Sequence, residues 1–193
     1  MAVSVRRVDV RAKSLASTRH ARSLMLSASV GALLLAAGPA MSQTTWTAAG
    51  PGVNWTTAGN WTAGVPTAAD IAQVTAPGTV GNPATSTAAG AAQELHIDAG
   101  NAVRVNAGGN LAVTDLISIG RLVGPSTSYL LIKAGGVVTA DRVFMGDGAP
   151  SGQVIIDGAG STLTAGSLMA IGGFGEGKLR LTNGGTAAQT TGD

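Results

Sequence analysis

The sequence predicts an all-β fold, a β-solenoid of about four stacked coils, and three observations lead to this interpretation. Short apolar segments alternate with glycine turns after residue 94, and no segment there keeps a helical apolar period over three turns. A glycine also recurs at a fixed interval in this region. The composition agrees, because 29 Gly with only three Trp, one Tyr and two Phe do not suit a core built around aromatic side chains.

The repeat is clearest at three apolar-glycine pairs spaced by 26 residues: Ile119-Gly120, Met145-Gly146 and Ile171-Gly172. A short apolar strand precedes each pair, and a loop, a second strand and another glycine turn follow it. A unit of this length cannot bury its own apolar face, whereas stacked coils pair each strand with its counterpart about 4.8 Å above and below. Three clear units and a degenerate one over 94–115 predict about four coils.

The chain divides into three parts on composition. Residues 1–42 have a basic stretch, a 14-residue apolar run over 24–37 and small residues before a cut expected after Ser42, which predicts a cleavable signal peptide. Residues 43–93 are rich in Thr, Ala, Gly and Pro and contain three Trp, a composition that predicts an irregular β cap. Residues 94–193 predict the solenoid, which we expect to be truncated at its C-terminal side. The apolar run is shorter than the roughly 20 residues that span a bilayer, so no transmembrane segment is expected after cleavage.

The basic character of the whole chain comes from its first part. Half of the 12 Lys and Arg residues precede residue 25, so that after cleavage six basic and 10 − 1 = 9 acidic residues remain, a net charge of −3. Nucleic acid is therefore not an expected partner. The sequence has no Cys, which excludes disulfides and thiolate metal sites.

Two glycine-rich motifs fall short of cofactor or metal sites. The segment 172–178 (GGFGEGK) fits the first seven positions of a phosphate-binding P-loop, but Leu179 stands where Ser or Thr would hold magnesium, and a strand pattern follows instead of a helix. The same segment resembles the calcium-binding nonapeptide of RTX proteins, but Gly177 occupies the Asp position. We predict a solenoid turn here, and neither a cofactor nor a metal.

An enzyme of the β-helical polysaccharide lyase or glycosidase type would need carboxylates, alone or with Arg or Lys, converging on one face. Asp115 and Asp141 lie one period apart with Arg142 beside them, which favours a solvated edge with a salt bridge. His96, between Leu95 and Ile97, is expected to be an exposed strand residue. The remaining candidates for such a site are Asp98, Asp147, Asp157, Glu176, Arg104 and Arg121.

Two interpretations are open for the three Trp residues, Trp46, Trp55 and Trp61. Exposed rings could stack on sugars, but their position before the repeats favours a cap that covers the first coil and prevents edge-to-edge pairing.

Two segments of the repeats, 154–164 (VIIDGAGSTLT) and 169–186 (MAIGGFGEGKLRLTNGGT), resemble the repeat associated with type V secretion and PEP-CTERM proteins. The front portion, from Trp46 to Asp70, is similar to the start of autotransporter passengers. The resemblance implies a right-handed parallel β-helix, exported and displayed at the bacterial cell surface in association with the outer membrane. It also implies a C-terminal translocator barrel, which this chain does not contain.

Together these patterns favour a secreted structural or adhesive passenger and not an enzyme, with no catalytic, cofactor-binding or metal-binding residues assigned. Host or matrix glycans or proteins are the expected partners. The alternative is a carbohydrate-binding or polysaccharide-cleaving β-helix, which would show a concave cluster of carboxylate and basic side chains on one face.

Overall fold

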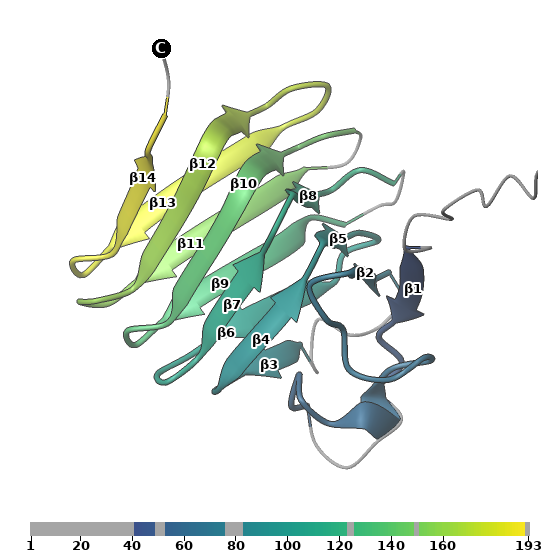
Figure 1. Cartoon of the computed structure of the whole chain (residues 1–193). Helices are drawn as coiled ribbons and strands as arrows, with labels where there is room; N and C mark the ends of the chain where they lie inside the picture. The colour runs from purple at the N-terminus through teal and green to yellow at the C-terminus, as the bar shows by residue number, and fades with distance from the viewer. Residues whose placement is uncertain (1–40, 49–52, 76–82, 123–125, 149–150, 192–193) are drawn as a thin grey trace, which may run out of the picture. The chain divides into compact units, whose positions relative to one another are not determined.

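Short apolar strands and glycine turns assemble into two parallel sheets in a computed structural model of the chain (Figure 1). The structure describes residues 41–48, 53–75, 83–122, 126–148 and 151–191. All of them belong to one unit, Ala37–Asp193. The predicted signal peptide lies outside the described residues except for Met41 and Ser42.

The larger sheet has nine strands. They are β1 (Ser42–Thr45), β2 (Asp70–Val74), β4 (Ala89–Ala92), β5 (Glu94–Ile97), β7 (Asn110–Val113), β8 (Leu116–Ile119), β10 (Val137–Met145), β12 (Thr162–Ile171) and β14 (Thr186–Gln189). The smaller sheet has five strands. They are β3 (Ala84–Ser86), β6 (Ala102–Val105), β9 (Ser128–Lys133), β11 (Gly152–Asp157) and β13 (Gly177–Thr182).

The chain passes from one sheet to the other five times, and each passage is one coil of a solenoid. A coil begins with a strand of the five-stranded sheet and continues into the nine-stranded sheet, as β3 does into β4 and β5, and β9 into β10. All pairings between these strands of successive coils are parallel. The prediction of an all-β parallel solenoid is confirmed, and the only helical segment among the described residues is the 3-10 turn η1 (Ala58–Asn60).

The 26-residue glycine series marks one corner of three successive coils, the second, third and fourth. Gly120, Gly146 and Gly172 have φ values of 75°, 73° and 77°, a left-handed conformation that glycine adopts without strain. Each N–H donates a hydrogen bond to a carbonyl one coil earlier, at Ile97, Ile119 and Met145 respectively. The three glycines therefore stack on one line, as the repeat predicts.

Aliphatic ladders fill the interior between the two sheets. One ladder contains Val105, Ile132, Ile156 and Leu181, and another contains Ile97, Ile119, Met145 and Ile171. The members in the earlier coils are completely buried, because a coil lies on each side of them. The same side chains therefore form both the inner wall of a coil and the contact between coils.

The solenoid begins about ten residues earlier than predicted, which gives five coils where about four were expected. The additional strands, β3 and β4, are rich in Ala, Ser and Gly and lie in the region predicted as a cap. The side chains of these strands are small for a physical reason, because even a Cβ atom on Gly90 would lie 3.1 Å from the Trp55 ring. Packing against the cap thus removes the aliphatic pattern that identifies the later coils.

The residues before β3 close the first coil. Trp61 packs edge to face against Trp46 and Trp55, with ring centroids 5.1 and 4.8 Å apart, and its Nε1–H donates to the Trp55 carbonyl at 2.7 Å. The backbone of Trp55 also donates to the Thr85 carbonyl of β3. All three rings are buried, as expected for side chains that cover the first coil, and they offer no exposed ring face for a sugar.

No helix in the described part of the chain has the length and apolar character needed to cross a bilayer.

Candidate binding face on the five-stranded sheet

The outer surface of the five-stranded sheet gathers side chains from the last four coils. Along β9 and β11 buried and partly exposed residues alternate, because successive side chains of a strand point to opposite sides. The inward positions hold Leu and Ile or Val, as at Leu130 and Ile156. The outward positions are polar, charged or, near the middle, apolar.

Strand register arranges these outward side chains in three ladders. The first contains Tyr129, Gln153 and Lys178; the second contains Arg104, Leu131, Ile155 and Arg180; the third contains Lys133, Asp157 and Thr182. We call these ten residues the basic face. Neighbours along a ladder belong to successive coils, about 4.8 Å apart.

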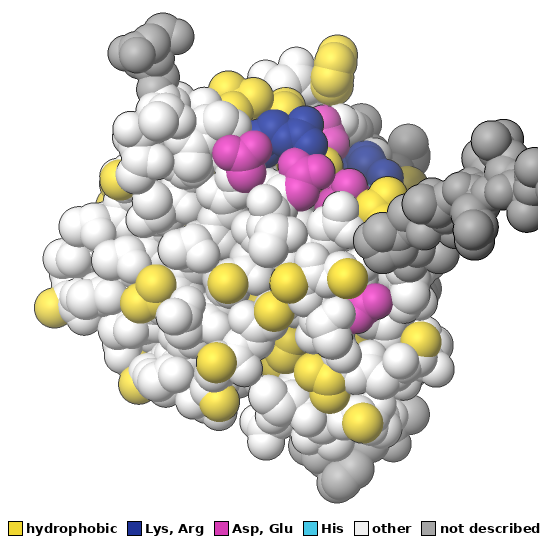
Figure 2. Space-filling model, viewed as in Figure 1, with side chains coloured by type: hydrophobic (Ala, Val, Ile, Leu, Met, Phe, Trp, Pro, Cys, Tyr) yellow, Lys and Arg dark blue, Asp and Glu magenta, His cyan; other side chains and the backbone are white. Residues whose placement is uncertain are grey.

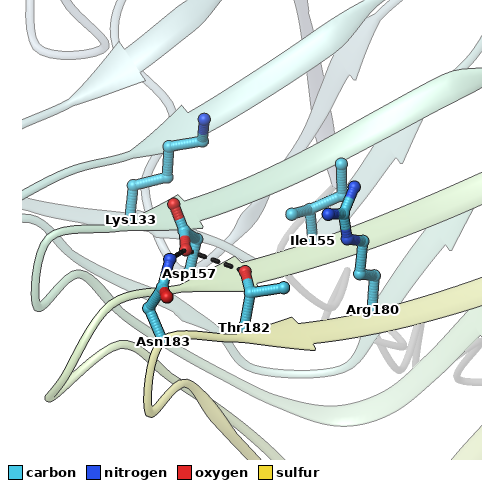
Figure 3. A pocket seen from close by; sticks show the side chains of 6 residues that line it. All are labelled: Lys133, Ile155, Asp157, Arg180, Thr182 and Asn183. Carbon is cyan, nitrogen blue, oxygen red and sulfur yellow. Dashed lines mark hydrogen bonds between the residues drawn. The ribbon is translucent and has the colours of Figure 1, made fainter.

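A hollow of about 390 Å³ lies on the basic face, lined by Lys133, Ile155, Asp157, Arg180, Thr182 and Asn183. Figure 3 shows Lys133 and Arg180 on opposite sides of this group, with Asp157 and Thr182 between them. The hollow therefore combines two cations, a carboxylate, a hydroxyl, an amide and an aliphatic side chain.

Asp157 is held in place as an ionised acceptor. Its Oδ1 accepts hydrogen bonds from Thr182 Oγ1 at 2.8 Å and from Asn183 Nδ2 at 2.7 Å (Figure 3). These two bonds, and to a smaller extent the charges of Lys133 and Arg180, lower the pKa of Asp157 below its ordinary value. A carboxyl with a lowered pKa carries no proton near neutral pH, so it can accept hydrogen bonds but cannot act as a general acid.

The basic face is also where most of the positive charge after residue 42 lies. Of the six Lys and Arg residues that follow residue 42, it holds four: Arg104, Lys133, Lys178 and Arg180. Its own carboxylate is that of Asp157. Lys178 is paired with Glu176 of the preceding turn at 2.7 Å, with both side chains exposed, so this contact stabilises little. The Nε atom of Arg104 is buried without a hydrogen-bond partner among the described residues.

The outer surface of the nine-stranded sheet is different. Figure 2 shows charged side chains of both signs along one edge of this face and few in its middle. At this edge Arg142 donates to Asp115 through Nε at 3.0 Å and Nη2 at 2.5 Å, while Asp141 lies 4.0 Å away. The predicted salt bridge is confirmed, and the hydrogen bonds and charge of Asp115 raise the pKa of Arg142 further. The two carboxylates neutralise an arginine here and do not line the hollow.

Two other carboxylates that the sequence analysis considered, Asp98 and Asp147, each bind neighbouring groups and do not form a shared site. Asp98 is fully buried, and its Oδ1 accepts from the backbone N–H groups of Arg121 and Leu122 at 2.6 and 3.1 Å. Asp147 accepts from Ser118 Oγ at 2.8 Å. Across the described residues no group of three or more His, Cys, Asp or Glu side chains has the spacing of a metal site. These contacts order turns between coils.

The prediction that His96 is an exposed strand residue is wrong, because the residue is only 4% exposed. Burial lowers its pKa, the charge of Arg121 adds to this effect, and Glu94 and Asp98 oppose it. The imidazole is therefore neutral at pH 7 and donates Nε2–H to Glu94 Oε2 at 2.8 Å. Nδ1 is left buried with no hydrogen-bond partner in the described part of the chain.

The glycine-rich segment 172–178 forms the turn that leads into β13, as predicted from its strand-like continuation. Gly172 is the left-handed corner residue, and Gly175 donates its N–H to the Gly146 carbonyl at 2.9 Å. Lys178 lies on a strand and not at a helix N-terminus. The phosphate-binding arrangement of a P-loop is therefore not formed.

Sequence reasoning missed the basic face as a unit. It singled out Arg104 and Asp157 separately, and Lys178 only through the P-loop pattern. The available signal was the alternation of cations with inward-facing aliphatic residues, as in Lys178-Leu179-Arg180, where Leu179 is partly buried and both cations are exposed. Loop lengths that differ between coils hid which outward residues share a ladder.

Comparisons with protein-family models, curated proteins and solved structures gave no match. The residues and contacts described above therefore carry the functional argument.

Proposed function

We propose that this chain is an exported cell-surface protein whose solenoid acts as a non-catalytic structural or adhesive scaffold. The observation that carries the proposal is the stack of five coils in register, closed by a buried Trp cluster at its first coil. In a stack of parallel coils the inward-facing residues maintain the fold. The outward-facing residues form a long surface and can vary without loss of packing.

The sequence supports export. The basic stretch, the apolar run over 24–37 and the small residues before Ser42 have the order of a secretory signal, and the absence of Cys suits a chain that crosses oxidising compartments without disulfides. The coil stack suits such a chain, because its stability comes from packing and backbone pairing.

Export can be tested in a bacterial host that expresses the full chain with an epitope tag inserted in the exposed 172–176 turn. We expect the tag outside the cytoplasm, with a new N-terminus at Gln43. A matched variant with Leu33→Arg and Leu34→Arg should retain the uncleaved chain in the cytoplasm, because charges interrupt the apolar run. An uncleaved, cytoplasmic wild-type chain would contradict the proposal.

Carbohydrate binding is the second candidate function, and the hollow on the basic face favours it. The hollow combines groups that bind sugar hydroxyls, namely Asp157, Thr182 and Asn183, with cations on both sides. Cleavage is less well supported, since the lowered pKa of Asp157 removes the proton that a general acid must supply.

A further inference from the structure

We propose that the basic face binds an acidic polysaccharide, a chain of sugars bearing carboxylate or sulfate groups. The inference deepens the proposed adhesive role by naming a ligand class. It rests on the proposed function only in assuming that the exported chain encounters the polysaccharide outside the cell. Binding itself depends on the basic face alone.

The first argument is charge complementarity that is local to one surface. Four of the six cations after residue 42 lie on the basic face, although the chain from that point has a net charge of −3. The remaining two, Arg121 and Arg142, have carboxylate neighbours at Asp98 and Asp115. Lys178 on the basic face is likewise paired, with Glu176 at 2.7 Å, whereas Arg104, Lys133 and Arg180 have no carboxylate within 4.0 Å in the described part of the chain. The unpaired positive charge of the described residues therefore lies on the five-stranded sheet, where it attracts an anion.

The second argument is the repeat distance. Lys133 and Arg180 are on β9 and β13, two coil steps apart, which corresponds to about 10 Å, and Arg104 lies one coil step before Lys133. Cations thus recur along the solenoid axis on β6, β9 and β13 of one sheet. This arrangement fits an extended polymer better than a compact ligand with one anionic group. The anionic groups of such a polymer also recur along its length.

The third argument distinguishes a polysaccharide from other polyanions. Asp157 lies between Lys133 and Arg180, is ionised and is only partly exposed, so it repels any anionic group that comes close but accepts a hydrogen bond from a neighbouring hydroxyl group. Asn183 and Thr182 beside it add amide and hydroxyl groups. A ligand that carries both anionic groups and many hydroxyl donors satisfies these neighbours together.

The apolar middle of the basic face supports the same class. Leu131 and Ile155 are neighbours on one ladder between Arg104 and Arg180, and Tyr129 is on the adjacent ladder. Sugar rings present C–H groups that pack on aliphatic and aromatic surfaces. One aromatic side chain provides little stacking area for successive nucleobases, which single-stranded nucleic acid would require.

The test measures binding of the purified mature chain to polygalacturonate, dextran sulfate, neutral dextran and single-stranded DNA at low and physiological salt. We expect binding to at least one acidic polysaccharide that weakens with salt, and none to neutral dextran. The first two probes separate a carboxylate ligand from a sulfate ligand. Absence of binding to both, or DNA binding at least as tight, would overturn the inference.

Variants locate the site. Lys133→Gln with Arg180→Gln should weaken polysaccharide binding about tenfold or more, because two charged hydrogen-bond donors are lost. Arg142→Gln with Arg121→Gln removes the same charge from outside the basic face, on β10 and in the turn after β8, and should change binding less than about twofold. Equal losses in the two double variants would show nonspecific attraction and would contradict the site. Circular dichroism of both variants checks that the sheets remain folded.

Asp157→Asn separates sugar recognition from plain electrostatics. Removing this negative charge should strengthen DNA binding, whereas exchanging the charged hydroxyl acceptor for the weaker amide acceptor should offset that gain for polygalacturonate. The preference for polygalacturonate over DNA therefore falls, and an unchanged preference would contradict the role of Asp157. If the chain binds as described but is not exported, the proposed function fails and the inference stands; an exported chain that does not bind gives the reverse result.

Discussion

The first coil and the last described coil of the solenoid have similar strands but differ in how they are covered. At the first coil three Trp rings pack under β3 and β4 and are at most 5% exposed. At the last described coil the inward-facing Leu181 is 47% exposed, although its partners Ile156 and Ile132 on the same ladder are fully buried. Position along the stack, and not residue type, thus determines how much an apolar side chain stabilises the fold.

The difference follows from the way a solenoid is stabilised. Each coil contacts only its neighbours, so an inner coil gains apolar burial and hydrogen bonds on both sides, whereas a coil without a described neighbour gains them on one side. We therefore expect stability to be concentrated between the Trp cluster and β11. The following predictions test this gradient.

The largest effect is expected at the cap. Trp61→Ala removes the ring that packs between Trp46 and Trp55, and its hydrogen bond to the Trp55 carbonyl, which should lower the free energy of unfolding by about 3–5 kcal/mol. Phe174→Ala is the matched aromatic control, because Phe174 is 87% exposed, and should change it by less than about 0.5 kcal/mol. Denaturant titration measures both; similar losses would show that the cap does not close the stack.

The next effect compares two neighbours on one interior ladder. Ile156→Ala leaves a cavity between coils and should cost about 2–5 kcal/mol. Leu181→Ala should cost about 1 kcal/mol, since nearly half of that side chain already contacts solvent. Equal costs in the same titration would mean that the last coil is packed as tightly as the inner ones.

A smaller effect is expected at the turns. Gly146→Ala places a Cβ atom 2.5 Å from the backbone of Glu176 at a residue with φ of 73°, so it should cost about 1–3 kcal/mol. Gly173→Ala lies in the next turn, where a Cβ atom meets nothing within 4 Å, and should be nearly neutral. A thermal melt of the two variants decides, and a neutral Gly146→Ala would contradict the close contact between turns.

The smallest effect is a pH dependence carried by His96. Because of burial, its pKa in the folded chain lies below the ordinary value of 6.5. As pH falls below about 7, the unfolded chain therefore binds more protons at this residue than the folded chain does, which favours unfolding. Stability should therefore be constant above roughly pH 7.5 and decrease toward pH 5.5, and His96→Gln should decrease less over that range. Parallel unfolding curves at these pH values measure the difference. Identical slopes for the wild type and the variant would show that His96 is not the group responsible.

The coil architecture could be predicted from the sequence because one corner of three successive coils is a left-handed glycine. Gly120, Gly146 and Gly172 keep this position at a constant interval, so the period is visible even where loops differ in length. The first coil could not be recognised, because contact with Trp55 requires glycine at Gly90 and small neighbours, which removes the aliphatic signal.

The candidate site was less accessible to sequence reasoning. Its ladders depend on which residue of one coil pairs with which residue of the next, and a change of one residue in a loop moves an outward side chain to the interior. His96 illustrates the same limit, because alternation correctly places it opposite Leu95 and Ile97 but cannot show that other parts of the chain bury it.

Hydrogen exchange of individual backbone amides tests the central claim most directly, since it reports layer-to-layer hydrogen bonding coil by coil. The account predicts the slowest exchange in β6, β9 and β11, and faster exchange at alternate residues of β13 and β14, whose amides point away from the stack. Rapid exchange throughout β9 and β11, or protection that is highest in β13 and β14, would contradict a stack whose inner coils are stabilised from both sides and whose first coil is covered by the Trp cluster.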